Sequence, residues 1–222
     1  LNFEKEKIGT KILDRLGLET LKKPDWTKWK TYVSRINRPK KTVDVAIVNK
    51  YVVTGSFKLA DCFISVSQSL VHAGAELDVG VNIHWVDAKS VEESGNPAGK
   101  LAGYHGILIP GGFGAQGYEG MISAVRYARE NDIPYLGLCY GMQLAVCEYA
   151  RNVCGLADAC TTEIMPDTPH PVITIIESQK DTLKTLGYGG TMRLGAYASV
   201  IVPGSRIYAM YERTGRIEHD AV

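Results

Sequence analysis

Long hydrophobic runs are missing from this sequence, and its first residues do not form a basic stretch followed by an apolar one. We therefore expect no membrane-spanning helix and no secretory leader. Cysteine is sparse, and the odd number and irregular spacing of the five cysteines are typical of reduced thiols in a cytoplasmic protein. Neither the cysteines nor the five scattered histidines have the spacing of a zinc site, so we expect no resident metal.

A strong charge of one sign is also absent, because the formal net charge is +1. The charge is uneven, since residues 1–42 carry 12 lysines and arginines against 5 acidic residues. Basic segments of this kind can bind nucleic acid. Here the basic residues alternate with apolar residues at helical spacing, which favours a solvated helix face or a surface that docks on another domain. We expect no nucleic-acid partner, and the sequence has no Gly-x-x-x-x-Gly-Lys-Ser/Thr loop for nucleotide phosphates.

Strand and helix patterns alternate through most of the chain, whose 222 residues and 45% hydrophobic content suit an α/β domain with an appendage. The predicted strands cover residues 43–48, 81–86, 106–110 and 135–138. The predicted helices cover residues 4–18, 24–36, 59–73, 119–131 and 142–150. We predict an α/β fold with a doubly wound, mostly parallel sheet, in which functional residues gather at the carboxyl ends of the strands.

Less regular segments give further expectations. Gly74 is expected to end the helix that begins at Leu59, and residues 88–103 are expected to form an exposed loop. Beyond residue 170 the pattern changes. The segments expected to form strands and turns there, as an antiparallel extension, are 171–176, 189–195, 196–202 and 206–211.

One stretch, residues 133–143, combines a short apolar strand, a cysteine and a helix-forming run. Cys139 stands at the turn, with Gly137 two residues before it and Gly141 two residues after it. This is the pattern of a nucleophile elbow, in which a tight strand-to-helix turn exposes the nucleophile. The glycines allow strand and helix to approach closely. The positive end of the helix favours the thiolate, which is the reactive form.

The simpler interpretation of any free cysteine is that it fills the core. We assign that role to the other four: Cys62, Cys147, Cys154 and Cys160. Cys139 differs from them through its glycine neighbours, through Gln143 on the following helix, and through a glycine turn upstream.

A thiolate that attacks a carbonyl group needs backbone N–H groups to stabilise the developing negative charge. The N–H of Tyr140, directly after the cysteine, is one candidate. The segment Gly111–Gly114, which we call the glycine loop, follows a predicted strand and can supply the second, because glycines let N–H groups point inward. Alone, this segment would be read as a plain tight turn. Beside the cysteine elbow we interpret it as part of an oxyanion hole.

The order of these motifs resembles the class I (triad) glutamine amidotransferases, and within that family the glutaminase domain of the CTP synthases. The segments that carry the resemblance are Val48–Tyr51, Ile109–Gly114, Tyr127–Gly137, Ala150–Leu156, Thr162–Glu163 and Gly189–Gly195. The resemblance implies a flavodoxin-like glutaminase domain over residues 43–222. It also implies that residues 1–42 are linker helices that follow a synthetase domain absent from this sequence.

The resemblance further implies a role for each candidate site residue. Cys139 would attack the side-chain amide of glutamine, giving a glutamyl thioester and ammonia, while Gly112 and Tyr140 would supply the oxyanion N–H groups. The residues expected to hold the substrate are Gly111, Phe113, Gln143, Glu163 and Arg213. In the whole enzyme, a homo-oligomer, the ammonia would aminate UTP to CTP. ATP and Mg²⁺ would bind mainly in the synthetase domain, and this domain itself would need no cofactor.

Some positions depart from the family pattern. Asn49 and Tyr140 replace a glycine and a leucine that are usual there. Gln116 stands where these enzymes commonly carry an arginine linked to activation by GTP, so a GTP response is not predicted. The His-Pro-Glu motif that completes the triad does not follow Arg213, and His219 is only a weak substitute. We expect that the sequence is truncated or lacks a segment there.

Three other interpretations stay open. The first is another class I amidotransferase of the GMP synthetase type, against which segment 189–195 argues. The second is a non-catalytic regulatory or assembly module of the same fold, which the missing His-Pro-Glu motif would explain. The third, a cysteine hydrolase unrelated to glutamine, explains fewer of the motifs.

Overall fold

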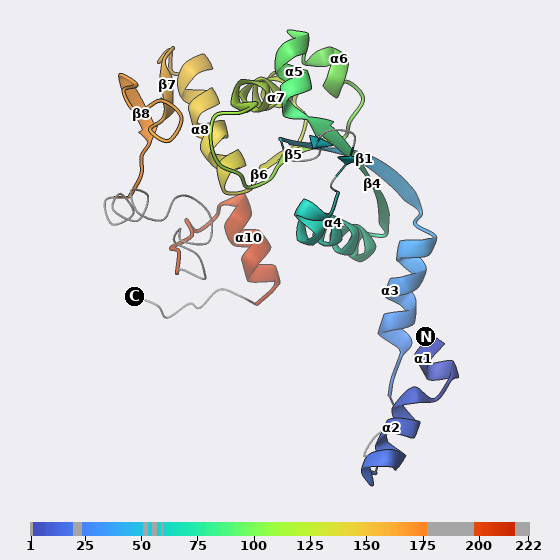
Figure 1. Cartoon of the computed structure of the whole chain (residues 1–222). Coiled ribbons are helices and arrows are strands. Elements are labelled where there is room, and N and C mark those ends of the chain that lie inside the picture. Colours follow the sequence, from blue (N-terminus) through green and yellow to red (C-terminus); the bar gives the residue numbers. More distant parts are fainter. Residues whose placement is uncertain are drawn as a thin grey trace. The chain divides into compact units, whose positions relative to one another are not determined.

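The chain divides into two compact units, Leu1–Thr174 and Ile175–Val222 (Figure 1). The computed structural model describes residues 2–19, 24–50, 53–54, 57–58, 60–176 and 198–215. The first unit contains every candidate site residue except Arg213.

A four-stranded sheet forms the centre of the first unit, and all its neighbouring strands are parallel in the order β4-β1-β5-β6 (Figure 1). Its strands are β1 (Lys41–Asn49), β4 (Val79–Asp87), β5 (Gly106–Ile109) and β6 (Tyr135–Gly137). Each overlaps a predicted strand, so the parallel sheet is confirmed. Ile47 pairs with Leu108, and Ile109 pairs with Gly137, which brings the carboxyl ends of the strands to one edge.

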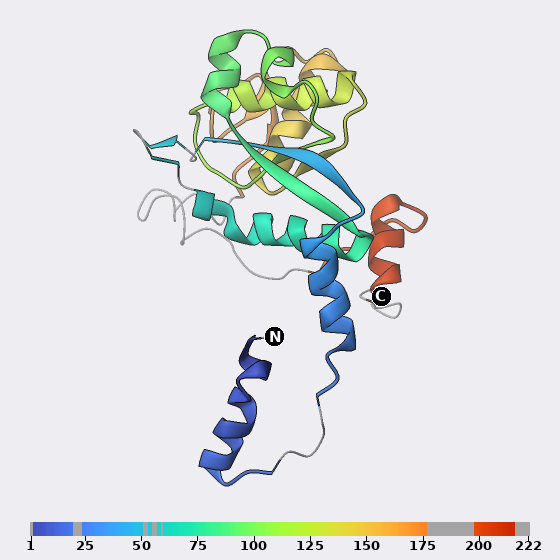
Figure 2. The ribbon, with the colours of Figure 1, turned by 90° about the vertical axis from the view of Figure 1, so that its right-hand side faces the viewer.

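Helices cover both faces of this sheet, as a doubly wound fold requires. On one face lies α4 (Ile64–Leu77), and on the other lie α5 (Ala88–Ser94) and α7 (Tyr118–Glu130) (Figure 2). The next helix, α8 (Tyr140–Asn152), packs against α7. Successive strand residues face opposite sides, so Ala46 and Val48 of β1 join one core cluster with side chains of α7 and α8. Full burial of a side chain such as valine contributes roughly 1.5–3 kcal/mol.

Two small sheets lie outside the central one. The strands β2 (Val53–Thr54) and β3 (Phe57–Lys58) form an antiparallel pair. The strands β7 (Ala159–Thr161) and β8 (His170–Ile173) form a parallel pair, and β7 packs against α8. The strand predicted over residues 171–176 is therefore present in a shorter form.

The exposed loop expected over residues 88–103 is wrong. The segment folds into α5 and α6 (Ala98–Leu101). Ala88, Val91 and Leu101 are fully buried. The polar run from Ser94 to Pro97 covers only the last residue of α5 and the short connection to α6.

The expectation that Gly74 ends its helix is also wrong. A short 3₁₀ turn, η1 (Ala60–Phe63), precedes α4, which continues beyond Gly74 to a left-handed cap at Asp78 with a φ of 56°. A Cβ atom on Gly74 would overlap the carbonyl oxygen of Val79. The glycine is therefore needed for the close approach of α4 to the start of β4. Leu59, the predicted first residue, lies outside the described residues.

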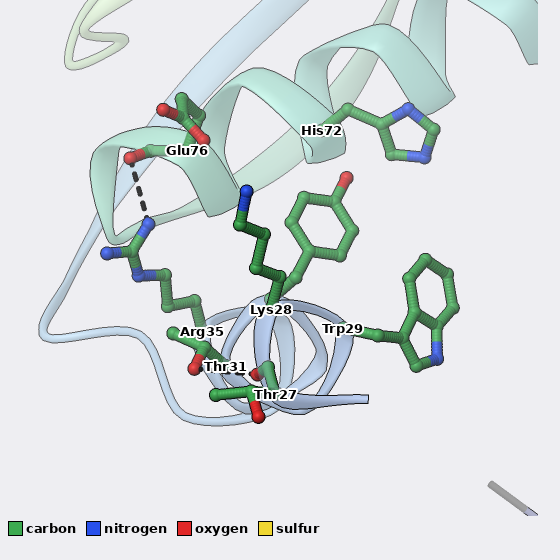
Figure 3. A pocket seen from close by; sticks show the side chains of 8 residues that line it. Thr27, Lys28, Trp29, Thr31, Arg35, His72 and Glu76 are labelled. Atoms are coloured by element: carbon green, nitrogen blue, oxygen red, sulfur yellow. Dashed lines mark hydrogen bonds between the residues drawn. The ribbon is translucent and has the colours of Figure 1, made fainter. Parts of the chain in front are cut away.

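The amino-terminal helices are α1 (Asn2–Lys5), α2 (Ile8–Leu16) and α3 (Thr27–Asn37). The single helix predicted over residues 4–18 is interrupted at Lys7, which is left-handed with a φ of 52°. Gly17 ends α2 in a left-handed conformation with a φ of 64°. A pocket of about 580 Å³ lies between α3 and α4. Arg35, which lines it, donates to the carbonyl oxygen of Glu76 at 3.2 Å (Figure 3). There the ring of Trp29 stacks on Tyr32 of its own helix.

The second unit contains a helix, α10 (Arg206–Arg213), whose first turn is capped by the hydroxyl of Ser205. Residues 206–211 therefore do not form the predicted strand, and residues 198–202 have no regular structure. Segment 189–195 and residue 219 lie outside the described residues.

The helices α5 and α7 approach each other closely at Gly120. A Cβ atom on Gly120 of α7 would overlap the carbonyl oxygen of Ala88 and lie 3.0 Å from the nitrogen of Glu92. Because the two helices would have to separate, we expect Gly120→Ala to lower the free energy of unfolding by about 1–3 kcal/mol in urea titration. Gly9→Ala is the matched control, since this helical glycine has nothing within 4 Å of a Cβ atom. An equal loss in both variants would contradict the explanation.

Candidate active site

Three strand ends meet at the carboxyl edge of the central sheet. Lys50 directly follows β1, the glycine loop follows β5, and Cys139 follows β6. Because these strands are parallel neighbours in the order β1-β5-β6, their ends lie side by side. The expected gathering of functional residues at the carboxyl ends of the strands is confirmed for these three segments. Tyr51, which follows Lys50, lies outside the described residues.

The turn at Cys139 has the backbone of a nucleophile elbow. Cys139 has a φ of 53° and a ψ of −104°, a strained conformation for a residue with a side chain. The N–H of Leu138 donates to the carbonyl oxygen of Ile109 at 2.9 Å, which holds the turn against β5. The N–H of Gln143 donates to the carbonyl oxygen of Cys139 at 3.1 Å, so α8 begins directly at the cysteine.

There is no room for a side chain at either of the two glycines that flank the cysteine. A Cβ atom on Gly137 would lie 2.6 Å from the nitrogen of Met142. A Cβ atom on Gly141 would lie 2.9 Å from the Cβ of Ile109. The strand, the turn and the helix can therefore approach this closely only with glycine at both positions, which confirms the prediction.

Cys139 is exposed at the amino terminus of α8, where the helix dipole favours an anion. Cys147 and Cys160 are buried, as predicted, but Cys62 and Cys154 are exposed and the prediction for them is wrong. Cys62 lies in the 3₁₀ turn before α4, and Cys154 lies in the turn after α8, so neither is inside a packed element.

The glycine loop lies against the elbow. A Cβ atom on Gly111 would stand 3.7 Å from the Cβ of Cys139, which is ordinary contact distance. The backbone of Gly111 therefore lies close to Cys139. This is the position that a second oxyanion donor would need.

Side chains from three segments hold the far end of the glycine loop. The carboxylate of Glu163 accepts from the N–H of Gly114 at 2.5 Å. The hydroxyl of Tyr140 donates to the carbonyl oxygen of Gly114 at 2.6 Å. The ammonium of Lys50 donates to the carbonyl oxygen of Phe113 and, at 2.8 Å, to that of Gly114. The loop is thus tied to β1, to α8 and to the turn after β7.

Lys50 is almost fully buried in this arrangement, with 8% of its surface exposed. Its ammonium lies 4.9 Å from the centre of the Tyr140 ring, which is within cation–π range. Burial lowers the pKa of Lys50, and the negative charge of Glu163 acts in the opposite direction. The sequence pattern places Lys50 directly after an apolar strand, at a strand end where functional residues gather, but it assigns this lysine no role of its own.

The structure brings most of the candidate residues together. Those around the elbow and the glycine loop are Cys139, Gly111, Gly112, Phe113, Tyr140 and Glu163. Gln143 lies in the first turn of α8, partly buried. Arg213 is the last residue of α10, in the second unit.

Within the described ranges, no group of three or more histidine, cysteine, aspartate or glutamate side chains is arranged to hold a metal ion. None of the helices that the structure describes is long and apolar enough to cross a membrane.

Comparison with known proteins gives one family match. The sequence profile of the family described as "Glutamine amidotransferase class-I" matches residues 58–213. That range contains the elbow, the glycine loop and Glu163.

Curated relatives with similar sequences are called CTP synthases. The one from Pyrococcus abyssi is 45% identical over 213 residues, which are 96% of this chain and 38% of the relative. The one from Sulfolobus acidocaldarius is 44% identical over 95% of this chain and 38% of its own length. The chain therefore spans little more than a third of the length of these relatives.

A solved structure is also similar. It is titled "Trypanosoma brucei CTPS - glutaminase domain with bound acivicin", and it matches with a TM-score of 0.55 and 37% sequence identity. The match covers 62% of this chain and 52% of the other.

The site geometry predicts which thiol reacts first. We expect limiting iodoacetamide at neutral pH to modify Cys139 before the other cysteines, because it is exposed at a helix amino terminus. Cys147 should react slowly, since burial raises its pKa to about 11. Cys62 and Cys154 are the internal controls, being exposed without this position. Peptide mapping that finds either control modified first would refute the assignment.

Proposed function

The chain belongs to the class I glutamine amidotransferases, and we propose that it hydrolyses glutamine as the glutaminase domain of a CTP synthase. The observation that carries the proposal is the placement of Cys139, in a strained elbow at a helix amino terminus and against the backbone of Gly111. A core cysteine needs none of these features.

In the proposed reaction, the thiolate of Cys139 attacks the side-chain carbonyl carbon of glutamine. The negative charge that develops on the carbonyl oxygen is stabilised by the N–H groups of Gly112 and Tyr140. Collapse of this intermediate breaks the C–N bond while the nitrogen takes up the proton that the thiol lost on forming the thiolate, so that ammonia leaves and a glutamyl thioester remains. Water then attacks the thioester, releasing glutamate and restoring the thiol.

We assign the recognition of glutamine to the residues predicted for it. Gly111 and Phe113 would contact the substrate from the glycine loop, and Gln143 would contact it from the first turn of α8. One carboxylate oxygen of Glu163 accepts from Gly114, and the other would receive the substrate ammonium group. Arg213 would bind the substrate carboxylate.

The rest of the proposed enzyme lies outside these 222 residues. The relatives are much longer than this chain, and we propose that the additional length includes a synthetase domain that uses ATP and Mg²⁺ to aminate UTP. Residues 1–42 would be the linker to that domain, and residues 43–222 the glutaminase. We expect the whole enzyme to be a cytoplasmic homo-oligomer.

A non-catalytic module of the same fold is the second candidate. The observation that favours it is the missing His-Pro-Glu motif, since thiol catalysis needs a base. An amidotransferase of the GMP synthetase type is less favoured, because segment 189–195 resembles the CTP synthase branch.

Acivicin labelling tests the nucleophile. We expect acivicin, which is bound in the structurally similar glutaminase domain, to add once to this protein and to protect Cys139 from later alkylation. Cys139→Ser should abolish the adduct in intact-mass measurement. Cys154→Ser, which removes another exposed thiol, should leave it unchanged. An adduct that persists in Cys139→Ser would exclude the proposed nucleophile.

Ammonia release tests the missing base. A positioned histidine contributes typically ~10²–10⁴-fold to a reaction of this kind. We therefore expect residues 1–222 to hydrolyse glutamine slower by about that factor than a chain extended through a His-Pro-Glu segment. Equal rates would place the base within the 222 residues, and His219 would then be the first candidate to mutate.

A test for CTP formation separates this domain from the whole enzyme. With UTP, ATP, Mg²⁺ and ammonia, we expect residues 1–222 to form no CTP, because the sequence has no phosphate loop of the Gly-x-x-x-x-Gly-Lys-Ser/Thr type. CTP detected by chromatography above the level of a protein-free control would show that a nucleotide site lies in this chain.

A further inference from the structure

We propose that Lys50 is a positioning residue for the oxyanion hole: its ammonium sets the orientation of the glycine loop and so aims the N–H of Gly112 at the substrate. The inference rests on the proposed glutaminase function and adds to it a residue outside the substrate contacts. It starts from the two hydrogen bonds that the ammonium donates to consecutive carbonyl groups, those of Phe113 and Gly114.

The peptide group between Phe113 and Gly114 is held at both ends. In a trans peptide the C=O and N–H groups point in opposite directions. Lys50 binds the carbonyl oxygen of Phe113, while Glu163 binds the N–H of Gly114 at 2.5 Å. A cation on one side and an anion on the other therefore allow only one orientation of this peptide plane.

A loop of this composition needs such a constraint. Three of its four residues are glycine, and Gly114 has a φ of 75°. Glycine reaches left-handed and right-handed conformations at similar cost, so its neighbouring peptide groups rotate easily. Without the ammonium, the carbonyl groups of Phe113 and Gly114 would lose a charged donor. The peptides nearer the thiol, including that of Gly112, would then lose their fixed direction.

The same ammonium links the loop to the nucleophile. The carbonyl oxygen of Gly114 accepts from Lys50 at 2.8 Å and from the hydroxyl of Tyr140 at 2.6 Å. Tyr140 is 1% exposed and is the first residue of α8, directly after Cys139. Lys50 therefore fixes one oxyanion donor segment relative to the other. A buried cation is costly unless it is well bonded, which is consistent with a role that a surface lysine could not fill.

The test compares glutamine turnover with simple thiol alkylation in Lys50→Met, which keeps an unbranched side chain up to the ε position and removes the ammonium group. Lys89→Met is the matched control, since Lys89 is exposed and bonds only to Glu93 of its own helix among the described contacts. Both variants are made in the full-length protein. Turnover requires an oxyanion hole, whereas iodoacetamide alkylation of Cys139 requires only an accessible thiolate.

We expect Lys50→Met to lower kcat for glutamine by about 10- to 100-fold. This loss is no larger than the loss caused by removing one oxyanion donor outright. KM and the rate of Cys139 alkylation should stay within about threefold of the unmodified protein, because ground-state binding and the thiol are untouched. Lys89→Met should match the unmodified protein.

A rescue experiment uses Lys50→Ala. Added ethylammonium should restore part of kcat, because it returns a donor to the space left by the lysine side chain. Sodium at equal ionic strength should restore none of it.

The inference is overturned if Lys50→Met keeps full kcat, if alkylation of Cys139 falls in the same proportion as kcat, or if ethylammonium restores nothing. Each result would mean that Lys50 does not act through the loop. An unmodified full-length protein that releases no ammonia from glutamine would overturn the proposed function, and the inference with it.

Discussion

The chain can turn from β6 into α8 at Cys139 only because no side chain stands at Gly137 or Gly141. A Cβ atom at either position would come within 3 Å of neighbouring atoms, from Met142 in one case and Ile109 in the other. Close packing of this kind leaves little freedom. The strained backbone of the cysteine is therefore held by the surrounding fold, which fixes the direction of the thiol before any substrate binds.

The glycine loop depends on a different kind of constraint. It has few side chains to pack, so charged and polar groups from distant parts of the sequence hold it: Lys50 after β1, Tyr140 at the start of α8, and Glu163 after β7. Donors that are already oriented cost no reorganisation during the reaction, which is why preorganised N–H groups stabilise an oxyanion so effectively. The parallel sheet contributes by bringing the ends of β1, β5 and β6 to the same edge.

Local patterns predicted the central sheet and the elbow well, because both depend on short-range features: apolar strands, and glycines on each side of Cys139. Interactions between distant segments were harder to predict. The polar residues of segment 88–103 led to the expectation of an exposed loop. The segment instead forms two helices whose apolar side chains are buried against α7. Gly74 suggested a helix end, whereas it permits contact between α4 and β4. Lys50 gave no local sign of its role, since its partners lie more than 60 residues away.

The central claim is that Cys139 carries a covalent glutamyl group during glutamine hydrolysis. The most direct measurement is intact-mass analysis of protein that is mixed with glutamine and quenched in acid within the first turnover, followed by peptide mapping. We predict a glutamyl adduct on the peptide that contains Cys139 and none in Cys139→Ala. An adduct on another residue, or glutamine hydrolysis by Cys139→Ala at the unmodified rate, would contradict it.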